Sequence, residues 1–435
     1  MGKLMIKKSR SLMGEIKIPG DKSISHRALI FSSMGEGESI IKNFLFSQDC
    51  ISTMNCLRAL GTSIEICENV IKVKGNGING FREPENVLDA GNSGTTIRLF
   101  TGLLSGLPGI FSVITGDDSL RRRPMKRVVE PLLGMGAKIW GRNGGNNPPL
   151  AIKGEKLKGR DHTLSVASAQ VKSALLIAGL LADGETSVTE PSLSRDHTER
   201  IFQYLGLPLI RNGLTLKTHG IEGFKNKDFN IPGDFSSAAF IIAAGLLVEG
   251  SKIVIKNVGI NPTRIGMLSV LKEAGAKIQI LNQWEEGGEP IGDLIVEFSI
   301  LESFEVRGEI VPKLIDEVPI LAIIATQAKG KSVFKDVGEL KVKESDRIKA
   351  VVDGINKMGG KAEIIDEGFV VYGPTKLNGN EIETYNDHRI AMSFAIAGLL
   401  ADGETIVESN SISISFPNFG ETIKKLGGNI IELQS

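Results

Sequence analysis

The sequence has few of the residues that disulfide or metal chemistry requires. Its 435 residues include three cysteines, Cys50, Cys56 and Cys67, and none of them belongs to a CxxC pair. A secreted disulfide framework uses more cysteines in a shorter chain, so a reducing compartment is expected. The five histidines form no HxxxH or HxH pair. We therefore predict no metal site and no cofactor.

Aromatic side chains, net charge and long apolar runs are scarce as well. Aromatic residues make up 5% of the chain, and Lys plus Arg equal Asp plus Glu at 51 each. A neutral chain has no field that would draw it to nucleic acid or to an anionic membrane, so neither partner is expected. No apolar run reaches the roughly 18 to 20 residues of a membrane span. Residues 1–10 lack a signal-peptide core, and nothing resembles a transit extension, so a bacterial cytoplasmic protein is expected.

Two sequence patterns recur along the chain, six times each. In the first, an apolar helical stretch is followed by a glycine turn and a β-branched strand; the clearest copies are residues 178–188, 243–255 and 397–407. In the second, an amphipathic helix closes on a glycine that supplies the left-handed residue after its last turn. These glycines are Gly61, Gly136, Gly206, Gly275, Gly359 and Gly427. The alternation predicts an α/β fold of six units, about 70 residues each, which stack because none can bury its own faces.

A repeated phrase marks where the chain passes between two predicted domains. Ile18-Pro19-Gly20-Asp21 returns as Ile231-Pro232-Gly233-Asp234, each time just before a helix. Proline sets a chain direction and glycine accepts unusual dihedrals, so the pair suits a hinge. The sequence thus predicts one three-unit domain of residues 21–233 and another of residues 1–20 plus 234–435. We expect a ligand to bind in the cleft between them.

The first candidate site is the segment Gly20-Asp21-Lys22-Ser23-Ile24-Ser25-His26-Arg27 at the start of a helix. Free N–H groups and a positive dipole make a helix start suitable for anions, and Arg27 follows Ser23 by one turn on the same face. The segment predicts a phosphate or carboxylate site. An N-cap serine with surface charges is the alternative. Glu15 replaces the first glycine of a P-loop, which argues against a nucleoside triphosphate.

Three further segments of the first half have the same ambiguity. Residues 91–98 turn into a helix through small groups, residues 168–173 begin another, and residues 194–197 follow a strand. Each can bind a ligand or simply cap a helix. Residues 121–127 carry five positive charges without aromatic neighbours for base stacking, which favours a small anion over nucleic acid.

The second half has acids beside cations in three places. Ile315-Asp316-Glu317 interrupts apolar sequence, residues 343–347 are expected to open a helix, and residues 387–389 precede another. Such residues form either ordinary surface ion pairs or proton donors and acceptors beside anion-binding groups.

In this order, the segments resemble the 5-enolpyruvylshikimate-3-phosphate synthases, and SRDHTE resembles their class II branch. The resemblance spans essentially the whole chain and rests on GDKSISHR, GNSGTT, RRRPM, ASAQVKS, SRDHTE, IDE, ELKVKESDRI, NDHRIAMS and SFPNF. It implies the enolpyruvyl transferase fold, an α/β, inside-out barrel-like arrangement of two domains with three βαβαββ units each. It also implies a monomer that transfers the enolpyruvyl group of phosphoenolpyruvate to the 5-hydroxyl of shikimate 3-phosphate, in the pathway to chorismate and aromatic amino acids.

The resemblance also implies roles for individual residues, matched motif by motif. Shikimate 3-phosphate is expected to contact Lys22, Ser23, Arg27, Ser168, Ala169, Gln170, Arg195, Asp316 and Lys343. Phosphoenolpyruvate is expected to contact Lys22, Gly94, Arg123, Gln170, Arg347 and Arg389. The catalytic residues are expected to be Asp316 as base for the hydroxyl, Glu344 near Lys22 as proton donor to C3, and Lys22 itself.

The chain departs from the family at one place, and rival functions remain. Ile414 precedes Ser415-Phe416-Pro417 where many members of the other branch have a lysine that contacts phosphoenolpyruvate. Gly94 stands where an alanine is associated with glyphosate tolerance, so sensitivity is expected. The sister transferase that acts on UDP-N-acetylglucosamine typically has a catalytic cysteine near residues 121–127, where this chain has none. Two more rivals are an RNA-binding or RNA-processing relative and a binding relative without catalytic activity.

Overall fold

The described part of the chain, residues 2–68 and 70–433 of a computed structural model, folds into two compact units. The terminal unit consists of residues 1–19, 232–285 and 290–435. The inserted unit consists of residues 20–231 and takes in residues 286–289, the tip of a hairpin whose strands belong to the terminal unit. Both units mix helices with sheets, so the predicted α/β class is confirmed. Among the described residues, no helix is long and apolar enough to cross a membrane.

The same supersecondary repeat forms all six four-stranded sheets of the described residues, three in each unit. A strand and a helix lead to a parallel second strand, and a second helix leads to two further strands. In every sheet the order is first, second, last and third strand, and the second strand pairs antiparallel with the last. The predicted βαβαββ units are therefore confirmed.

The inserted unit takes the first strand of its first repeat from far along the chain. That repeat contains β16 (Phe229–Asn230), α1 (Lys22–Met34), β3 (Glu36–Lys42), α2 (Gln48–Ala59), β4 (Ser63–Cys67) and β5 (Val70–Asn76). The second contains β6 (Leu88–Asp89), α3 (Gly94–Ser105), β7 (Phe111–Thr115), α4 (Lys126–Gly134), β8 (Lys138–Gly141) and β9 (Asn147–Lys153). The third contains β11 (Asp161–Thr163), α6 (Ala169–Leu180), β13 (Glu185–Thr189), α7 (His197–Leu205), β14 (Ile210–Asn212) and β15 (Thr215–His219). Short extra elements are α5 (Arg142–Gly145), β10 (Leu157–Lys158) and β12 (Ala182–Asp183).

The terminal unit completes two of its repeats with strands from the N-terminal segment. Its first repeat contains β2 (Met13–Lys17), α8 (Phe235–Leu247), β17 (Lys252–Gly259), α9 (Gly266–Glu273), β18 (Lys277–Glu286) and β19 (Glu289–Glu297). The second contains β20 (Glu305–Val306), α10 (Val318–Ala325), β21 (Gly330–Phe334), α11 (Arg347–Lys357), β22 (Lys361–Ile365) and β23 (Gly368–Gly373). The third contains β24 (Glu381–Ile382), α12 (His388–Gly398), β25 (Glu404–Glu408), α13 (Phe419–Lys425), β26 (Ile430–Leu433) and β1 (Lys3–Lys7).

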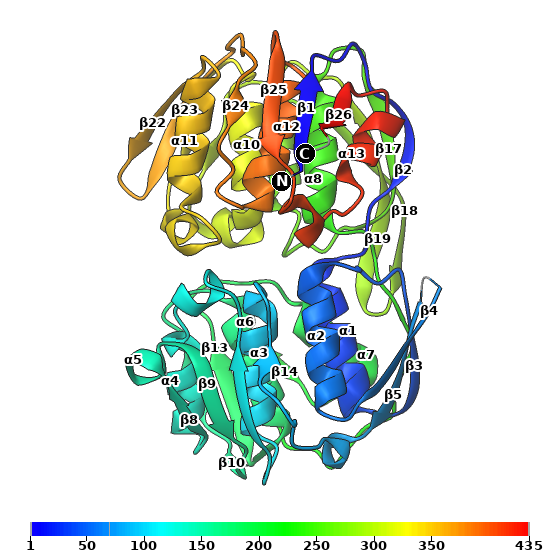
Figure 1. The fold of residues 1–435 in the computed structure, drawn as a ribbon, viewed down its shortest axis with the longest axis vertical. Coiled ribbons are helices and arrows are strands. Elements are labelled where there is room, and N and C mark those ends of the chain that lie inside the picture. Colours follow the sequence, from blue (N-terminus) through cyan, green and yellow to red (C-terminus); the bar gives the residue numbers. More distant parts are fainter. Residues whose placement is uncertain (1, 69, 434–435) are drawn as a thin grey trace. The chain divides into compact units, whose positions relative to one another are not determined.

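The first helix of each repeat lies in the interior of its unit, with the sheets around it. In the terminal unit α8, α10 and α12 pack against one another, and every residue of the three helices is buried (Figure 1). Helices that are apolar all round belong in a core, whereas α7 and α11 are amphipathic, and α11 packs against β22. In the inserted unit α3 and α6 pack together in the same way. Three inner helices per unit therefore bring three helix starts together.

Two local predictions about the helices have definite outcomes. The six predicted helix-ending glycines all have positive φ, and Gly206 at the end of α7 is a left-handed C-cap. The expectation that residues 343–347 open a helix is wrong for most of the segment. Helix α11 begins at Arg347, because Asp346 caps it by accepting from the Lys349 N–H, so Lys343 and Glu344 lie before the helix.

Candidate active site

In the inserted unit, the starts of α1, α3 and α6 are joined by side-chain hydrogen bonds. Arg98 Nη1 of α3 donates to Gln170 Oε1 of α6 at 2.7 Å, and Gln170 Nε2 donates back to Thr95 Oγ1 at 2.9 Å. Arg27 Nη2 of α1 donates to Ser173 Oγ of α6 at 2.7 Å. Three sets of exposed N–H groups and positive dipole ends thus lie beside basic side chains, an arrangement suited to an anion.

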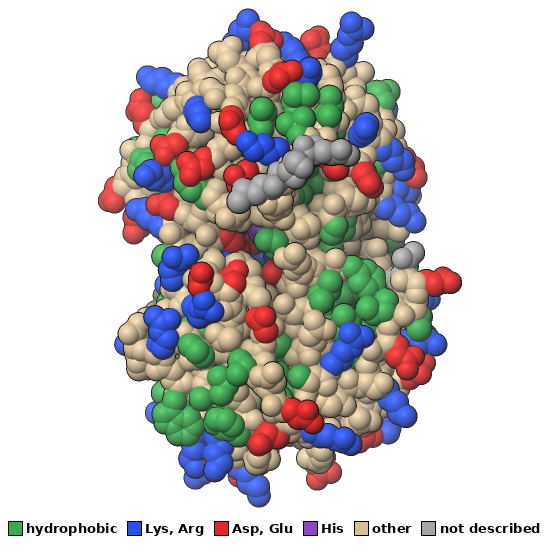
Figure 2. Space-filling view, viewed as in Figure 1, with side chains coloured by type: hydrophobic (Ala, Val, Ile, Leu, Met, Phe, Trp, Pro, Cys, Tyr) green, Lys and Arg blue, Asp and Glu red, His purple; other side chains and the backbone are tan. Residues whose placement is uncertain are grey.

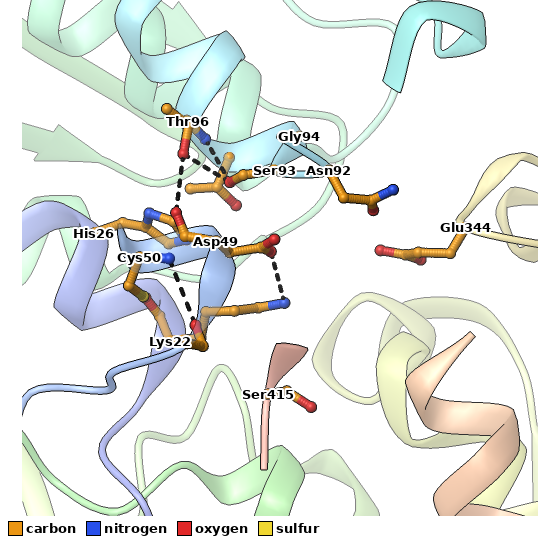
Figure 3. A network of polar contacts seen from close by, with 12 residues as sticks. Lys22, His26, Asp49, Cys50, Asn92, Ser93, Gly94, Thr96, Glu344 and Ser415 are labelled. Carbon is orange, nitrogen blue, oxygen red and sulfur yellow. Dashed lines mark hydrogen bonds and ion pairs between the residues drawn. The ribbon is translucent and has the colours of Figure 1, made fainter. Parts of the chain in front are cut away.

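Lys22 lies at this end of α1, as predicted, and has a carboxylate partner that the sequence did not identify. Its Nζ is 3.2 Å from Oδ2 of Asp49, a buried residue in the first turn of α2 (Figure 3). The Lys22 side chain is 17% exposed. An ammonium has three donors, so a group of this kind can contact more than one anion.

A buried chain of polar side chains joins the helices near Lys22, and Figure 3 labels its two ends, His26 and Thr96. His26 Nδ1 lies 2.7 Å from Thr53 Oγ1, which in turn lies 2.7 Å from Thr96 Oγ1. Burial lowers the pKa of His26 well below its ordinary value, helped by the charge of Lys22, so the ring is neutral near pH 7. These contacts join α1, α2 and α3, so the site rests on rigid elements.

Arg27 is buried and has several bonds to the protein. Besides Ser173 it donates to Thr198 Oγ1 through Nε at 2.7 Å and to the Ser23 carbonyl through Nη1 at 2.9 Å. Burial lowers its pKa to about 10, which still leaves the guanidinium charged at neutral pH. The N-cap of α1 is Asp21, which accepts from the Ile24 N–H at 2.9 Å. The simple alternative for this segment, an N-cap serine at Ser23, is therefore wrong.

Gly94 begins α3 beside two guanidinium groups. A Cβ on Gly94 would lie 2.7 Å from Arg98 Nη1 and 3.2 Å from Arg123 Nη1, so only glycine leaves this space open. Arg123 Nη2 donates to Asn92 Oδ1 at 2.7 Å. Arg98 is the second residue that the sequence interpretation missed, although it is the last residue of the candidate segment 91–98.

The basic run at residues 121–127 is not one patch. Arg123 is half-buried and bonds to Asn92, whereas Arg122, Lys126 and Arg127 are exposed. Lys126 pairs with Glu130 of its own helix at 3.2 Å. The run therefore contributes one side chain, Arg123, to the group around Gly94.

The predicted residues of α6 and of the segment before α7 are partly capping residues. Ser168 is the N-cap of α6, and its hydroxyl accepts from the Val171 N–H at 3.5 Å, so this side chain has the capping role, which leaves its contact with a ligand a prediction. Ala169 and Gln170 occupy the first turn and are half-buried. Arg195 is half-buried in the loop that joins β13 to α7.

In the terminal unit, Arg347 is surrounded by three carboxylates. Its guanidinium, 2% exposed, donates to Asp387 Oδ2 at 2.8 Å, to Glu344 Oε2 at 2.6 Å and to Asp316 Oδ1 at 3.4 Å. Burial alone would lower the pKa of Arg347, but the charges of these acids raise it above its ordinary value. Arg347 thus holds both predicted catalytic acids, and Asp387 is a third residue that the sequence interpretation missed.

Asp316 lies in the short 3-10 turn η4 (Ile315–Glu317) just before α10, beside a second arginine. Arg389 Nη1 donates to the Asp316 carbonyl at 3.2 Å, and its Nη2 lies 3.7 Å from Asp316 Oδ2. Arg389 is in the first turn of α12, so the starts of α10 and α12 meet here. The half-buried Asp316 therefore lies between Arg347 and Arg389.

Lys343 and Glu344 precede α11 in the same group. Burial lowers the pKa of Lys343 below its ordinary value, although the charge of Asp316 opposes this shift. Ile414, at the position where the resemblance implies a lysine in the other branch, ends the 3-10 turn η6 (Ile412–Ile414). The structure thus brings Asp316, Lys343, Glu344, Arg347 and Arg389 together in one unit.

Comparisons with known proteins agree with this arrangement. The family described as EPSP synthase (3-phosphoshikimate 1-carboxyvinyltransferase) matches residues 6–423. The chain is 51% identical to a 3-phosphoshikimate 1-carboxyvinyltransferase of Carboxydothermus hydrogenoformans, over 96% of this chain and 97% of that one. It is 50% identical to the one of Thermodesulfovibrio yellowstonii, over 97% and 99%.

A solved structure agrees as well. The chain matches an EPSP synthase of Acinetobacter baumannii with a TM-score of 0.90 and 39% identity, over 100% of both chains. The match covers both units and every segment on which the resemblance was based. The chain therefore belongs to the EPSP synthase (3-phosphoshikimate 1-carboxyvinyltransferase) family.

Proposed function

We propose that this chain transfers the enolpyruvyl group of phosphoenolpyruvate to the 5-hydroxyl of shikimate 3-phosphate and releases phosphate. The observation that carries the proposal is the whole-length family match together with the intact set of acids and cations in each unit. The activity is that of a 3-phosphoshikimate 1-carboxyvinyltransferase in the pathway to chorismate and aromatic amino acids. It needs neither metal nor cofactor in this proposal.

The substrate contacts that we propose for the inserted unit lie at its helix starts and beside its basic side chains. Shikimate 3-phosphate would contact Lys22, Ser23, Arg27, Ser168, Ala169, Gln170 and Arg195. Phosphoenolpyruvate would contact Lys22, Gly94, Arg123 and Gln170. Helix N–H groups and guanidinium forks suit the phosphate and carboxylate groups of both substrates.

The contacts proposed for the terminal unit are Asp316 and Lys343 with the shikimate ring, and Arg347 and Arg389 with phosphoenolpyruvate. Asp316 is a carboxyl group positioned by Arg347 and Arg389, so it suits the base that takes the proton of the 5-hydroxyl. Because the proposed contacts come from both units, the proposal requires the units to meet around the bound substrates.

The proposed reaction is an addition followed by an elimination. The 5-oxygen bonds to C2 of phosphoenolpyruvate as Asp316 takes its proton, and Glu344 gives a proton to C3, so the double bond is lost. In the second step C3 returns a proton, the C2–C3 double bond forms again, and the C2–O bond to phosphate breaks. Arg123, Arg347 and Arg389 would stabilise the negative charge of the substrate carboxylate and the charge that develops on the leaving phosphate.

The rival substrates are less well supported. The sister transferase would need a cysteine near residues 121–127, but the cysteines are Cys50, Cys56 and Cys67. Burial raises the pKa of Cys50 and that of Cys56, the latter to about 12, so neither thiol is activated. In the one view that Figure 2 gives, Lys and Arg are interspersed with Asp and Glu, unlike a broad basic nucleic-acid surface. We also propose a monomer in the cytoplasm.

The test is phosphate release from phosphoenolpyruvate with shikimate 3-phosphate, with UDP-N-acetylglucosamine or with no acceptor. Release with shikimate 3-phosphate alone, abolished by Asp316→Ala and by Lys22→Ala, supports the proposal. The control is Lys126→Ala, which removes an exposed charge from the basic run and should keep full activity. Release that requires the nucleotide sugar, or no release at all, contradicts it.

A further inference from the structure

The residues around Arg195 form a buried polar network that neither the resemblance nor the proposed contacts explain. The loop after β13 and the first turn of α7 contain the sequence Ser194-Arg195-Asp196-His197-Thr198-Glu199, which we call the 194–199 segment. Four of its members, Ser194 and residues 197–199, are at most 3% exposed. Buried polar side chains require partners, so a specific structure surrounds this segment.

Lys172 is the centre of this network. It lies in the first turn of α6, two residues after Gln170, and its side chain is 0% exposed. Its Nζ is 2.8 Å from Glu190 Oε2 and 2.7 Å from Glu199 Oε1. One ammonium thus joins two buried carboxylates from opposite ends of the loop that carries Arg195.

Both carboxylates connect Lys172 to the 194–199 segment. Glu190 Oε1 accepts a hydrogen bond from the Ser194 hydroxyl, next to Arg195. Glu199 is a member of the first turn of α7 and also accepts from Arg211 Nη2 at 2.9 Å. Lys172 is the buried cation of this network, whereas Arg211 reaches Glu199 from the surface with its side chain 33% exposed.

The rest of the first turn of α7 is fixed by other partners. His197 Nδ1 lies 2.7 Å from Glu289 Oε1, and both side chains are 2% exposed. Thr198 Oγ1 accepts from Arg27 Nε and lies 2.6 Å from Ser173 Oγ, the neighbour of Lys172. The network therefore fixes Arg27, the start of α6 and the loop of Arg195 relative to one another.

We propose that Lys172 is a positioning residue that holds the loop of Arg195 and the start of α6 in the geometry that shikimate 3-phosphate requires. This inference rests on the proposed function. Without the ammonium, Glu190 would lose its ion pair and Glu199 would keep only the partly exposed Arg211, so the loop would move to expose a carboxylate to water. Lys172 touches no substrate in this proposal and acts through Glu190, Ser194 and Glu199.

Two variants test the proposal without leaving an unpaired buried charge. Lys172→Met combined with Glu190→Gln removes one charge of each sign, and Ser194→Ala removes the link to Glu190 without changing any charge. Steady-state KM is measured for each substrate. We expect the KM for shikimate 3-phosphate to rise about tenfold in the double variant and about threefold in Ser194→Ala, with the KM for phosphoenolpyruvate within about twofold of wild type.

Leu176→Ala is the matched control, because Leu176 is buried one turn further along α6 and has no part in the network. It should lower the melting temperature and leave both KM values unchanged. Folded variants with an unchanged KM for shikimate 3-phosphate, or an equal rise in Leu176→Ala, overturn the proposal. If the double variant does not fold, Ser194→Ala decides alone. A wild type without turnover of shikimate 3-phosphate overturns the proposed function before any variant is compared.

Discussion

Nε of Arg347 lies 2.8 Å from Oδ2 of Asp387, and both side chains are at most 2% exposed. Asp387 also accepts from the Ser345 hydroxyl at 3.0 Å and, as the N-cap of α12, from the Arg389 N–H at 2.9 Å. One carboxylate therefore fixes both arginines that face Asp316. The predicted catalytic acid depends on a residue that has no proposed contact with either substrate.

We expect Asp387→Ala to destabilise the terminal unit strongly. Removing one partner of a buried ion pair costs up to about 3–5 kcal/mol, and Arg347 would keep only Glu344 and Asp316, which are less buried than Asp387. The melting temperature followed by calorimetry checks this. Asp387→Asn keeps an oxygen for the Arg389 N–H and should lose less stability, while Asp402→Ala, which breaks exposed pairs with Lys8 and Lys376, should change little. A similar loss in Asp387→Ala and Asp402→Ala would contradict the account.

The lowered pKa of Lys343 predicts an alkaline limit to substrate binding. Burial places its pKa below 10.5, so the ammonium is lost as pH rises through that lowered value, sooner than for an exposed lysine. The KM for shikimate 3-phosphate should therefore rise on the alkaline side while pH is still below 10.5. Lys343→Arg keeps its charge over this range and should lack that rise. Identical pH profiles in the two proteins would exclude Lys343 as the titrating group.

Gly94→Ala should weaken the binding of glyphosate more than the binding of phosphoenolpyruvate. The new Cβ would lie 2.7 Å from Arg98 Nη1 and 3.2 Å from Arg123 Nη1, so these guanidinium ends must shift. We expect the KM for phosphoenolpyruvate to rise about threefold and the inhibition constant of glyphosate to rise about tenfold or more. Gly223→Ala is the control, because its Cβ would meet nothing closer than 3.5 Å. A Gly94→Ala variant without tolerance would count against this placement of the phosphoenolpyruvate site.

Arg98 and Gln170 should act as a pair. Their 2.7 Å hydrogen bond includes a charged donor, which contributes about 1.5–3 kcal/mol, so Arg98→Ala should lower kcat/KM for phosphoenolpyruvate about tenfold to a hundredfold. In a double-mutant cycle with Gln170→Ala, the two losses should be less than additive. Arg122→Ala removes an exposed arginine nearby and should have no effect. Fully additive losses would show that the two side chains act independently.

The sequence predicted correctly those structural features that depend only on residues close together in the chain. A glycine that ends a helix is required by its own backbone, so Gly206 and the other five were identified without any partner. The alternation of helix and strand likewise predicted the six repeats. Where the chain passes between the units, the alternation did not predict which sheet each strand joins. There β16 and β2 complete sheets whose other strands are distant in sequence.

The partners of the site residues could not be predicted in the same way. Lys22 and Asp49 are 27 residues apart, and Arg347 and Asp387 are 40 apart, so no local spacing records either pair. Lys172 was quoted within a motif, but its burial depends on Glu190 and Glu199 meeting it from another element. Sequence motifs located the candidate residues, whereas their electrostatic partners required the fold.

The most direct test of the central claim is to follow phosphoenolpyruvate labelled with ¹³C at C2 by NMR in the presence of unlabelled shikimate 3-phosphate and the purified protein. The account predicts an enol ether whose labelled carbon is bonded to the 5-oxygen of shikimate 3-phosphate, formed in step with one phosphate. Labelled pyruvate, or an enol ether that forms only when UDP-N-acetylglucosamine is supplied, would contradict it.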